Sequence, residues 1–505
     1  MTGKGRRSGG RATVELVWEG KYDAKGQLRP PRLPPAPPLH LSEVYTPTAT
    51  EPALGATGHA ASAPPPNSPG DPTPDSPGNL LLRGDNLAAL AALLPTWRNR
   101  LRLIYCDPPF DVGTDFTVRV PLRQSDAGAP DHLERLAYSD KWGRDEASYL
   151  QMMYERLLPL HALLQEGGCL FLHCDWRSNA HLRLMLDEVF GVGAFVNEIV
   201  WHYYNKYSAG KGALPRAHDS ILVYAKGGKA RLNPLREPRD TPRRQLVRHN
   251  VNGVLRNARD PEGKLLYRES TSRKVDDVWR IPQLQPASHE WTGYRTQKHH
   301  ELLRRVVELA SDPGDWVADF FCGSGTFPAV AQDLGRRWLA CDVGDLAIHL
   351  TRKRLLGRLK PGGTPPLHLF DLGRPASVSG TTTTQGHAIV HWAAPSPQAP
   401  DESPVLHLTD YQPPEGSPGS ASTGLNLVDF WALAPEPSTG DPLQPCWWSF
   451  RTAKRPTLIT QSAPLPSSLL AVTGSWRLLL IDRLGHRTEQ AVPPAPACQP
   501  PASPY

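Results

Sequence analysis

The chain has 505 residues, of which 39% are hydrophobic, and it carries a formal net charge of +6. This length can bury one large core with accessory parts, and the charge agrees with an anionic partner without identifying one. We expect a cytoplasmic protein that does not bind membranes: no apolar run reaches the roughly 18 residues of a membrane span, the basic N-terminus lacks a hydrophobic signal core, and seven scattered cysteines fit no disulfide framework.

The first 78 residues divide into an arm and a linker. We expect residues 1–29 to form an N-terminal arm, with a short strand within residues 12–22. Residues 30–78 are dominated by Pro, Ala, Ser, Gly and Thr, and such a segment cannot bury enough apolar surface to fold. We therefore expect residues 30–78 to be a disordered linker.

From residue 79 onward, short apolar runs alternate with helical patterns. The expected strands end at Asp85, Cys106 and Cys174, and the expected helices cover residues 87–94, 149–164 and 182–190. This alternation predicts an α/β fold with an open, mostly parallel sheet and helices on both faces. Residues 79–225 form the first half of that domain.

The strand Leu101–Cys106 runs directly into Asp107, Pro108, Pro109 and Phe110. The Asp107 carboxylate and the Pro108 carbonyl are two acceptors held close together, and Phe110 offers a flat apolar face beside them. A planar ring that carries an NH2 group suits this corner. An acid followed by two prolines is sometimes only a rigid turn, so the interpretation depends on the motifs that follow.

The same corner suits the activation of an aromatic amino group. The nitrogen lone pair is delocalised into the ring, and two acceptors on its hydrogens favour a more nucleophilic nitrogen and stabilise developing positive charge. The electrophile that this nitrogen attacks must lie in line with the lone pair, so positioning carries much of the rate. Where the ring is a nucleobase within a duplex, it must first be flipped out and stacked on an aromatic face.

Between Lys226 and Lys274 the chain becomes strongly basic, with 14 Lys and Arg against 5 Asp and Glu. A charge run is often only a solvated face. Arginine, however, pairs well with phosphates and guanine edges, which makes Arg243, Arg244 and Arg248 candidate DNA-binding residues. Lys206 and Lys211 lie in the preceding glycine-containing loop and are further candidates. A polar insertion, 111–142, follows Phe110 and is placed to close over a flipped base.

A second motif lies about two hundred residues after the first. An apolar strand ends at Asp319 and enters the turn Gly323-Ser324-Gly325, and a helix is expected over 327–334. The glycines allow close approach of the backbone to a ligand, and the helix N-terminus offers free N–H groups. The next strand ends at Asp342, roughly 20 residues past the glycines, where a ribose diol is usually held.

Together these motifs resemble the β class of S-adenosylmethionine-dependent DNA amino-methyltransferases, because the acid-Pro-Pro-aromatic motif precedes the Gly-x-Gly motif. The resemblance covers residues 79–360 and is strongest to the Mod subunits of type III restriction-modification systems and their stand-alone relatives. It implies a circularly permuted Rossmann-like methyltransferase fold. It also implies a target-recognition segment at 226–290 and a donor-binding half at 291–365.

The resemblance also implies roles for individual residues. Asp107, Pro108, Pro109 and Phe110 are the catalytic motif. For the donor S-adenosylmethionine, Asp342 is expected to hold the ribose, Asp85 to lie near the adenine ring, and Thr296 and Lys298 to reach the carboxylate. The residues expected around its methionine part are Asp319, Phe321, Gly323 and Gly325. Phe320 and His299 stand where proline is usual, which leaves every polar contact in place.

Several alternatives concern the target. In this family an aspartate before Pro-Pro most often accompanies adenine N6, so Asp107 favours adenine over cytosine N4. Cytosine C5 methylation requires a thiolate on a Pro-Cys loop, and we reject it because Cys106 and Cys446 are expected to be packing residues. A DNA-binding specificity subunit acting through a nuclease partner, and an RNA or small-molecule methyltransferase, are less favoured. Duplex DNA is the expected partner; a helicase–nuclease restriction subunit and a second copy of the chain remain open.

The C-terminal part resembles relatives less. Residues 366–424 are expected to be linker-like, and residues 425–505 to form a small β-rich accessory module. Trp447 and Trp448 are more commonly core residues than base-stacking ones in such a module. A zinc site at Cys169, His173 and Cys174 is disfavoured, because Cys169 and Cys174 face opposite sides of one strand.

Overall fold

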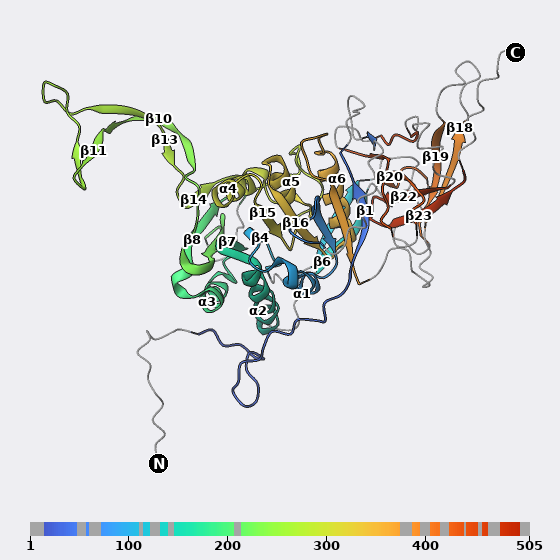
Figure 1. Cartoon of the computed structure of the whole chain (residues 1–505), viewed down its shortest axis with the longest axis horizontal. Coiled ribbons are helices and arrows are strands. Elements are labelled where there is room, and N and C mark those ends of the chain that lie inside the picture. The colour runs from blue at the N-terminus through green and yellow to red at the C-terminus, as the bar shows by residue number, and fades with distance from the viewer. Residues whose placement is uncertain are drawn as a thin grey trace.

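The computed structural model describes residues 15–47, 57–59, 72–110, 115–121, 132–139, 146–206, 214–373, 386–393, 404–414, 424–438, 441–452, 457–462 and 475–494. The main body is a ten-stranded sheet with helices on both faces (Figure 1). A thin β arm projects from one end of the sheet, and a smaller β module lies at the other end (Figure 1). The predicted α/β architecture with a small C-terminal β module is confirmed.

The main sheet has the order β1-β17-β3-β16-β15-β4-β7-β9-β8-β14. Neighbouring strands are parallel except in the pairs β1–β17, β7–β9 and β8–β9, so the sheet is mostly parallel, as predicted. Its strands are β1 (Leu39–Tyr45), β3 (Asn79–Arg83), β4 (Leu101–Cys106), β7 (Leu164–Cys174), β8 (Phe195–His202), β9 (His218–Ala225), β14 (Val278–Arg280), β15 (Trp316–Asp319), β16 (Arg337–Asp342) and β17 (Leu367–Leu372).

Helices cover both faces of the sheet (Figure 1). One face carries α1 (Asn86–Trp97), α2 (Glu146–Leu163) and α3 (Asn179–Phe190), and the other carries α4 (His300–Ala310), α5 (Thr326–Asp333) and α6 (Asp345–Leu356). Each layer encloses its own hydrophobic core. Strands between two helical layers must be apolar on both sides, which explains why all six residues of β4 are buried.

The crevice that positions the site lies where β4 and β15 are neighbours. These strands are parallel, with Asp319 opposite Tyr105, so both end at the same edge of the sheet. The next helix after β4 is α2 on one face, whereas β15 leads into α5 on the other face. Divergence of the chain at adjacent strand ends opens a crevice, the usual place for a ligand in such sheets.

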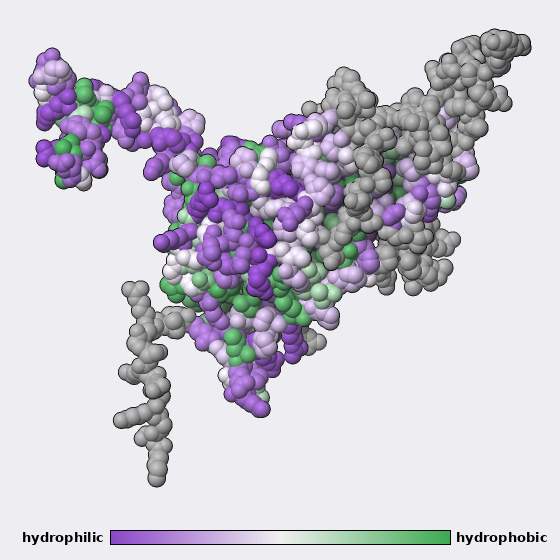
Figure 2. All heavy atoms as spheres, in the orientation of Figure 1, coloured by the Kyte–Doolittle hydropathy of each residue, from purple (hydrophilic) through white to green (hydrophobic). Residues whose placement is uncertain are grey.

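The basic segment forms an arm of antiparallel strands. In this arm β10 (Arg236–Leu246) pairs with β13 (Tyr267–Lys274), and β11 (Arg248–Val251) pairs with β12 (Val254–Asn257). The arm leaves the body beside β14, the edge strand, and its surface is predominantly hydrophilic (Figures 1 and 2). Exposed apolar side chains occur on it at Val254 and Leu255.

Three expectations about the less regular segments are wrong. The linker 30–78 contains β1, which pairs with β17 at the sheet edge, and the linker-like segment 366–424 contains β17 itself. That segment also contains the antiparallel pair β18 (His387–Ala393) and β19 (Val405–Gln412). In residues 15–29 of the N-terminal arm no strand forms; the segment is instead fixed by the buried Trp18, which donates to Gln151.

The C-terminal module is a five-stranded sheet that packs against the edge of the main sheet. Its order is β2-β21-β20-β22-β23. Trp447 and Trp448 are buried, so both are core residues as expected. The strands are β2 (Thr57–His59), β20 (Val428–Pro435), β21 (Trp447–Phe450), β22 (Trp476–Asp482) and β23 (Arg487–Val492).

A buried ionic network joins the module to the body. Glu43 of β1 is fully buried and accepts hydrogen bonds from Arg352 of α6, at 2.9 Å, and from Arg487 of β23. Tyr45 donates to the second Glu43 oxygen, at 2.7 Å. A second pair links Asp429 of β20 to Lys353 of α6, at 2.6 Å. Because these contacts span three parts of the chain, the module is part of the folded body.

No helix in the described part of the chain is both long and apolar enough to cross a membrane.

Candidate active site

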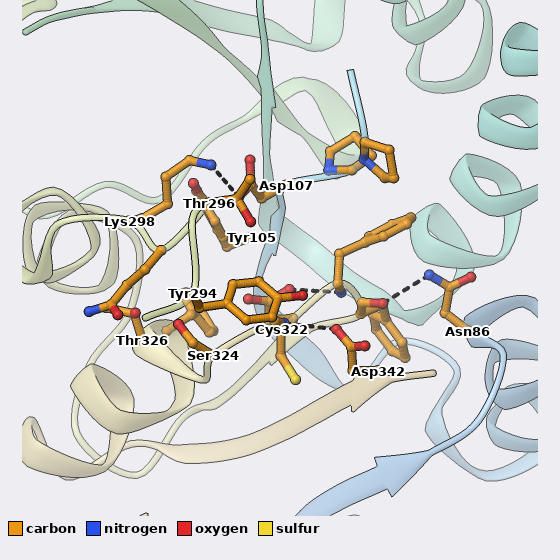
Figure 3. Close-up of a pocket in the computed structure, with 18 of the residues that line it drawn as sticks. Asn86, Tyr105, Asp107, Tyr294, Thr296, Lys298, Cys322, Ser324, Thr326 and Asp342 are labelled. Atoms are coloured by element: carbon orange, nitrogen blue, oxygen red, sulfur yellow. Dashed lines mark hydrogen bonds and ion pairs between the residues drawn. The ribbon is translucent and has the colours of Figure 1, made fainter. Parts of the chain in front are cut away.

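A cavity of about 300 Å³ occupies the crevice at the carboxyl ends of β4 and β15 (Figure 3). Among the described residues, four carboxylates line it against two cationic side chains, Arg156 and Lys298. The carboxylates belong to Asp85, Asp107, Asp319 and Asp342. An excess of acidic groups around a small, partly closed space favours a ligand that carries positive charge.

Asp107 follows the last residue of β4, and only one of its two carboxylate oxygens accepts a hydrogen bond in the described part of the chain. Lys298 donates to its Oδ2 at 2.5 Å, and Figure 3 shows the lysine directed at this carboxylate. The other oxygen, Oδ1, is buried and has no hydrogen-bond partner among the described residues. A buried acceptor without a donor is costly, so Oδ1 is suited to accept a hydrogen bond from a ligand.

His173 of β7 supports this corner from behind. It is fully buried; its Nδ1 lies 3.5 Å from Asp107 Oδ1 and 2.9 Å from the Tyr105 hydroxyl. Its Nε2 lies 3.4 Å from Asp219 Oδ2. Burial opposes ionisation of Asp219, but the contacts with His173, the charge of Lys298 and the hydrogen bond from Tyr203 together outweigh it and lower the pKa of Asp219.

The Phe110 ring extends the corner over the end of β7. Its centroid lies 5.4 Å from that of His173, and the Lys298 ammonium is 5.5 Å from it. The ring lines the cavity together with Pro108 and Pro109. The corner therefore combines a flat apolar face with an unpaired acceptor, which fits a planar ring that carries N–H donors.

The glycine turn forms the opposite wall. Gly323 and Gly325 both have positive φ, at 50° and 73°, which glycine adopts readily. A Cβ at Gly323 would meet the Tyr294 ring at 3.2 Å, whereas one at Gly325 would lie 2.6 Å from the Thr351 hydroxyl. Gly323 thus keeps the cavity open beside Tyr294, whereas Gly325 does not line the cavity and is required for packing against α6.

The carboxylates of this wall are fixed by backbone N–H groups. Asp342 accepts from Gly323 and Gly344, both at 2.8 Å, and Asp319 accepts from Phe321 at 2.9 Å. Burial raises the pKa of Asp319 well above its usual range, and the nearby Asp107 and Asp342 carboxylates add to the effect. Burial also raises the pKa of Asp342, against the opposing effect of its backbone donors. A cationic ligand would favour the ionised form of both groups.

A cluster around Arg156 closes the far side of the cavity. Arg156 of α2 contacts Asp85 at 3.2 Å and donates to Asn86 at 2.6 Å. Asn86 in turn donates to the Phe320 carbonyl at 2.9 Å, as Figure 3 shows. The Asp85 carboxylate also caps α1 through the N–H groups of Leu87 and Ala88.

Eleven of the twelve residues expected to form the catalytic motif and the donor site line this one cavity, and Gly325 is the exception. The contact of Lys298 with Asp107 was not expected from the sequence. Sequence reasoning also missed Asn86, Tyr105, Arg156, His173 and Tyr294. Arg156 had a usable signal, because a lone cation in the apolar pattern of a helix needs a partner. Tyr294 had none, since it is one aromatic residue in a polar loop.

The expected DNA-binding residues lie outside the cavity. Arg243 and Arg244 are exposed on β10, and Arg248 is exposed on β11. Arg244 stacks on the Tyr267 ring at 4.7 Å. Lys206 is exposed after β8, and Lys211 lies outside the described residues. The insertion after Phe110 contains the hairpin of β5 (Asp115–Pro121) and β6 (His132–Ser139), with Val118 packed near Tyr294.

The cysteines that were considered as nucleophiles or ligands are core residues. Burial raises the pKa of Cys106 well above its usual range and that of Cys446 to about 12, so both hold their protons at neutral pH. Cys169 lies in the core on one face of the sheet and Cys174 in the core on the other. This arrangement agrees with the alternation read from the sequence.

Comparison with known proteins gives consistent matches. The family described as DNA methylase matches residues 101–353. The type II methyltransferase M.EcaI of Enterobacter cloacae is 27% identical over 56% of this chain and 71% of its own length. The StyLTI Mod subunit, a type III restriction-modification enzyme of Salmonella typhimurium, is 28% identical over 49% of this chain. The chain spans about half (49%) of that subunit.

A smaller relative is similar over most of its length. The DNA adenine methyltransferase YhdJ of Escherichia coli K12 is 23% identical over 54% of this chain and 82% of its own length.

Proposed function

This chain belongs to the DNA methylase family that matches its residues 101–353, and on that premise we propose that it methylates the N6 amino group of adenine in DNA, using S-adenosylmethionine as donor. The observation that carries the proposal is the cavity in which Asp107 Oδ1 is buried, with no hydrogen-bond partner in the described part of the chain, opposite the glycine turn at Gly323. One wall is suited to an amino-bearing ring and the other to a donor.

The donor site fits the chemical groups of S-adenosylmethionine. Asp342, at the end of β16, is placed to hold the ribose hydroxyls, and Gly323 with Phe321 lies where the methionine part would pass. Asp319 offers a carboxylate to the ammonium group, and Asp85 lies with Asn86 on the adenine side. When bound, the donor supplies a methyl group on a cationic sulfonium, and the acidic lining of the cavity favours that charge.

The remaining chemistry belongs to the corner at Asp107. Asp107 Oδ1 and the Pro108 carbonyl accept the two N–H bonds of the flipped base, while Phe110 stacks on its ring. Lys298 and His173 hold the carboxylate in place, so that little reorganisation is needed as positive charge develops on the amino nitrogen. The same Oδ1 is the nearest acceptor for the proton that this nitrogen must release.

Asp107 favours adenine N6 over cytosine N4, because an aspartate before Pro-Pro most often accompanies adenine N6 in the family that the chain resembles. The relative YhdJ is a DNA adenine methyltransferase, which supports the same choice. Cytosine N4 is the second candidate, because it carries the same amino group on a smaller ring.

Duplex DNA is the proposed substrate, and the arm is the proposed recognition element. Between Arg236 and Lys274 the arm carries 11 Lys and Arg against 5 Asp and Glu, and most of these side chains are exposed. Exposed arginines on a projecting arm suit contact with phosphates and with guanine edges. Likeness to a Mod subunit supports a restriction subunit as a further partner, and we place the enzyme in the cytoplasm.

The test is methyl transfer from labelled S-adenosylmethionine to duplex DNA, followed by nucleoside analysis. N6-methyladenine is the expected product; N4-methylcytosine would overturn the choice of base. Asp107→Ala should abolish the transfer yet leave donor binding, measured by calorimetry, nearly intact. Equal loss of both would contradict the role given to Asp107. Transfer to RNA in preference to DNA would overturn the proposed substrate.

A further inference from the structure

A ledge of aromatic and cationic side chains lies at the same sheet edge as the cavity but outside it. Trp176, just after β7, has 52% of its surface exposed, and Tyr204, just after β8, has 56% exposed. A single exposed aromatic side chain is ordinary on a protein surface, and what distinguishes these two is the group of cationic side chains at the same sheet edge. We define the ledge by Trp176, Arg177, Tyr204, Lys206 and Arg216.

Two guanidinium groups lie over the Trp176 ring. Asp175, which is 6% exposed, accepts the Arg177 backbone N–H at 2.8 Å and also pairs with the Arg177 guanidinium. The Arg177 guanidinium lies 5.2 Å from the centroid of the Trp176 ring, and that of Arg216 lies 3.9 Å from it. The exposed ring therefore has a planar cation stacked on it.

The sheet brings Trp176 to the same edge as the catalytic corner. Strands β4 and β7 are parallel neighbours, with Cys106 opposite Leu172, so the chain after each strand leaves the sheet at this edge. The Phe110 ring contacts His173 of β7, three residues before Trp176 in the chain. Trp176 and the catalytic corner therefore follow adjacent strands at one edge of the sheet.

The positive charge of the ledge indicates an anionic partner. Arg177 and Lys206 are exposed and Arg216 is partly exposed, whereas Asp175, the acid next to Trp176 in the chain, is buried and paired with Arg177. A flat ring with a stacked guanidinium and further exposed cations matches a nucleobase whose phosphates lie alongside. A second copy of the chain, with an equally cationic ledge, would meet like charge.

We propose that the Trp176–Arg216 stack receives an unpaired DNA base next to the flipped nucleotide. This inference rests on the proposed function, because extrusion of one base leaves its former partner and its neighbours without full stacking. Two bases have the required chemistry: the orphaned partner on the opposite strand and the flanking base on the same strand. Stacking on an aromatic side chain is sequence-tolerant, so the ledge would add affinity without specifying sequence.

The test compares Trp176→Ala with Trp176→Phe and with Val192→Ala, which removes an exposed apolar side chain elsewhere. Affinity is measured by fluorescence anisotropy on duplexes with a mismatch at the target adenine. Trp176→Ala should weaken binding by roughly 5- to 150-fold, the range for loss of one stacked base. Trp176→Phe should retain most of the affinity, and Val192→Ala should match the unchanged protein.

Two further duplexes distinguish the base involved, one abasic opposite the target and one abasic at the flanking position. The effect of Trp176→Ala should vanish on whichever duplex lacks the stacked base. An undiminished effect on both would overturn the proposal, as would equal losses with Ala and Phe or no loss with either. A change in self-association of the protein alone would make the ledge a contact between copies and would also overturn it.

The outcome is separable from that of the proposed function. If the unchanged protein methylates DNA but binding is indifferent to Trp176, the ledge fails and the methyltransferase assignment stands. If DNA binding depends on the Trp176 ring but no DNA is methylated, the ledge binds DNA and the methyltransferase assignment fails.

Discussion

The buried Glu43 carboxylate provides the sharpest quantitative test of the fold. Glu43→Gln preserves the size of the side chain and removes its charge, which leaves the buried Arg352 guanidinium without its carboxylate partner and Arg487 with its pair to Glu489. Removing one partner of a buried ion pair typically costs about 3–5 kcal/mol. The substitution should therefore loosen the junction between the C-terminal module and the main sheet.

The pKa of Glu43 gives an independent magnitude. Burial alone would raise it, but Arg352 and Arg487 outweigh burial and lower the pKa from 4.5 to about 2. A shift of this size corresponds to about 3 kcal/mol of stability at neutral pH. Because the folded pKa lies below the unfolded one, this stability is fully present above about pH 5 and is lost as the pH falls toward 2.

The assay is thermal unfolding at pH 7, with Glu436→Gln as the control. Glu436 pairs with Arg477 on a partly exposed surface, where an ion pair contributes about 0–1 kcal/mol. For a chain of this length, a loss of about 3 kcal/mol should lower Tm by roughly 3 °C, and the control should shift it by about 1 °C or less. Equal shifts in the two variants would refute the reasoning, as would a Glu43→Gln deficit that persists unchanged at pH 3.

Three further predictions concern the site and the arm. Asp107→Asn should lower the rate of methyl transfer on the order of 10²- to 10³-fold, because the amide replaces an acceptor with a donor; single-turnover rates would show it, and a change of only a few-fold would contradict it. Gly325→Ala should destabilise the chain by about 1–3 kcal/mol, through its clash with the Thr351 hydroxyl and its positive φ, and calorimetric unfolding unchanged from the parent would count against that contact. Neutralising Arg243, Arg244 and Arg248 of the arm should weaken DNA binding and make it less dependent on salt concentration, as binding titrations at several salt concentrations would show. An unaltered salt dependence would place recognition elsewhere.

The central sheet and most of the cavity were predictable from the sequence for a simple physical reason. Parallel strands that end in acids deliver those acids to one edge, so Asp107, Asp319 and Asp342 had to meet once the strands were identified. Helices on both faces followed from strands that are apolar on both sides.

Other features depend on contacts between residues far apart in the chain. The strand β1 is embedded in a proline-rich segment and is stable only because β17 pairs with it and two distant arginines neutralise Glu43. The composition of the proline-rich segment around β1 does not indicate these distant partners. The Lys298–Asp107 pair joins residues 191 positions apart, so no local pattern could have indicated it.

The way the arm is attached has a consequence for how such an enzyme diversifies. Strands β10 to β13 pair only among themselves, and the chain re-enters the main sheet at β14, on the rim farthest from β1. No residue of 236–274 lines the donor cavity, and an exchange of this segment for a foreign hairpin would remove one ion pair to α4, that of Glu237 with Arg305. On the role proposed for the arm, such an exchange would change the target sequence while the residues of the cavity stay the same.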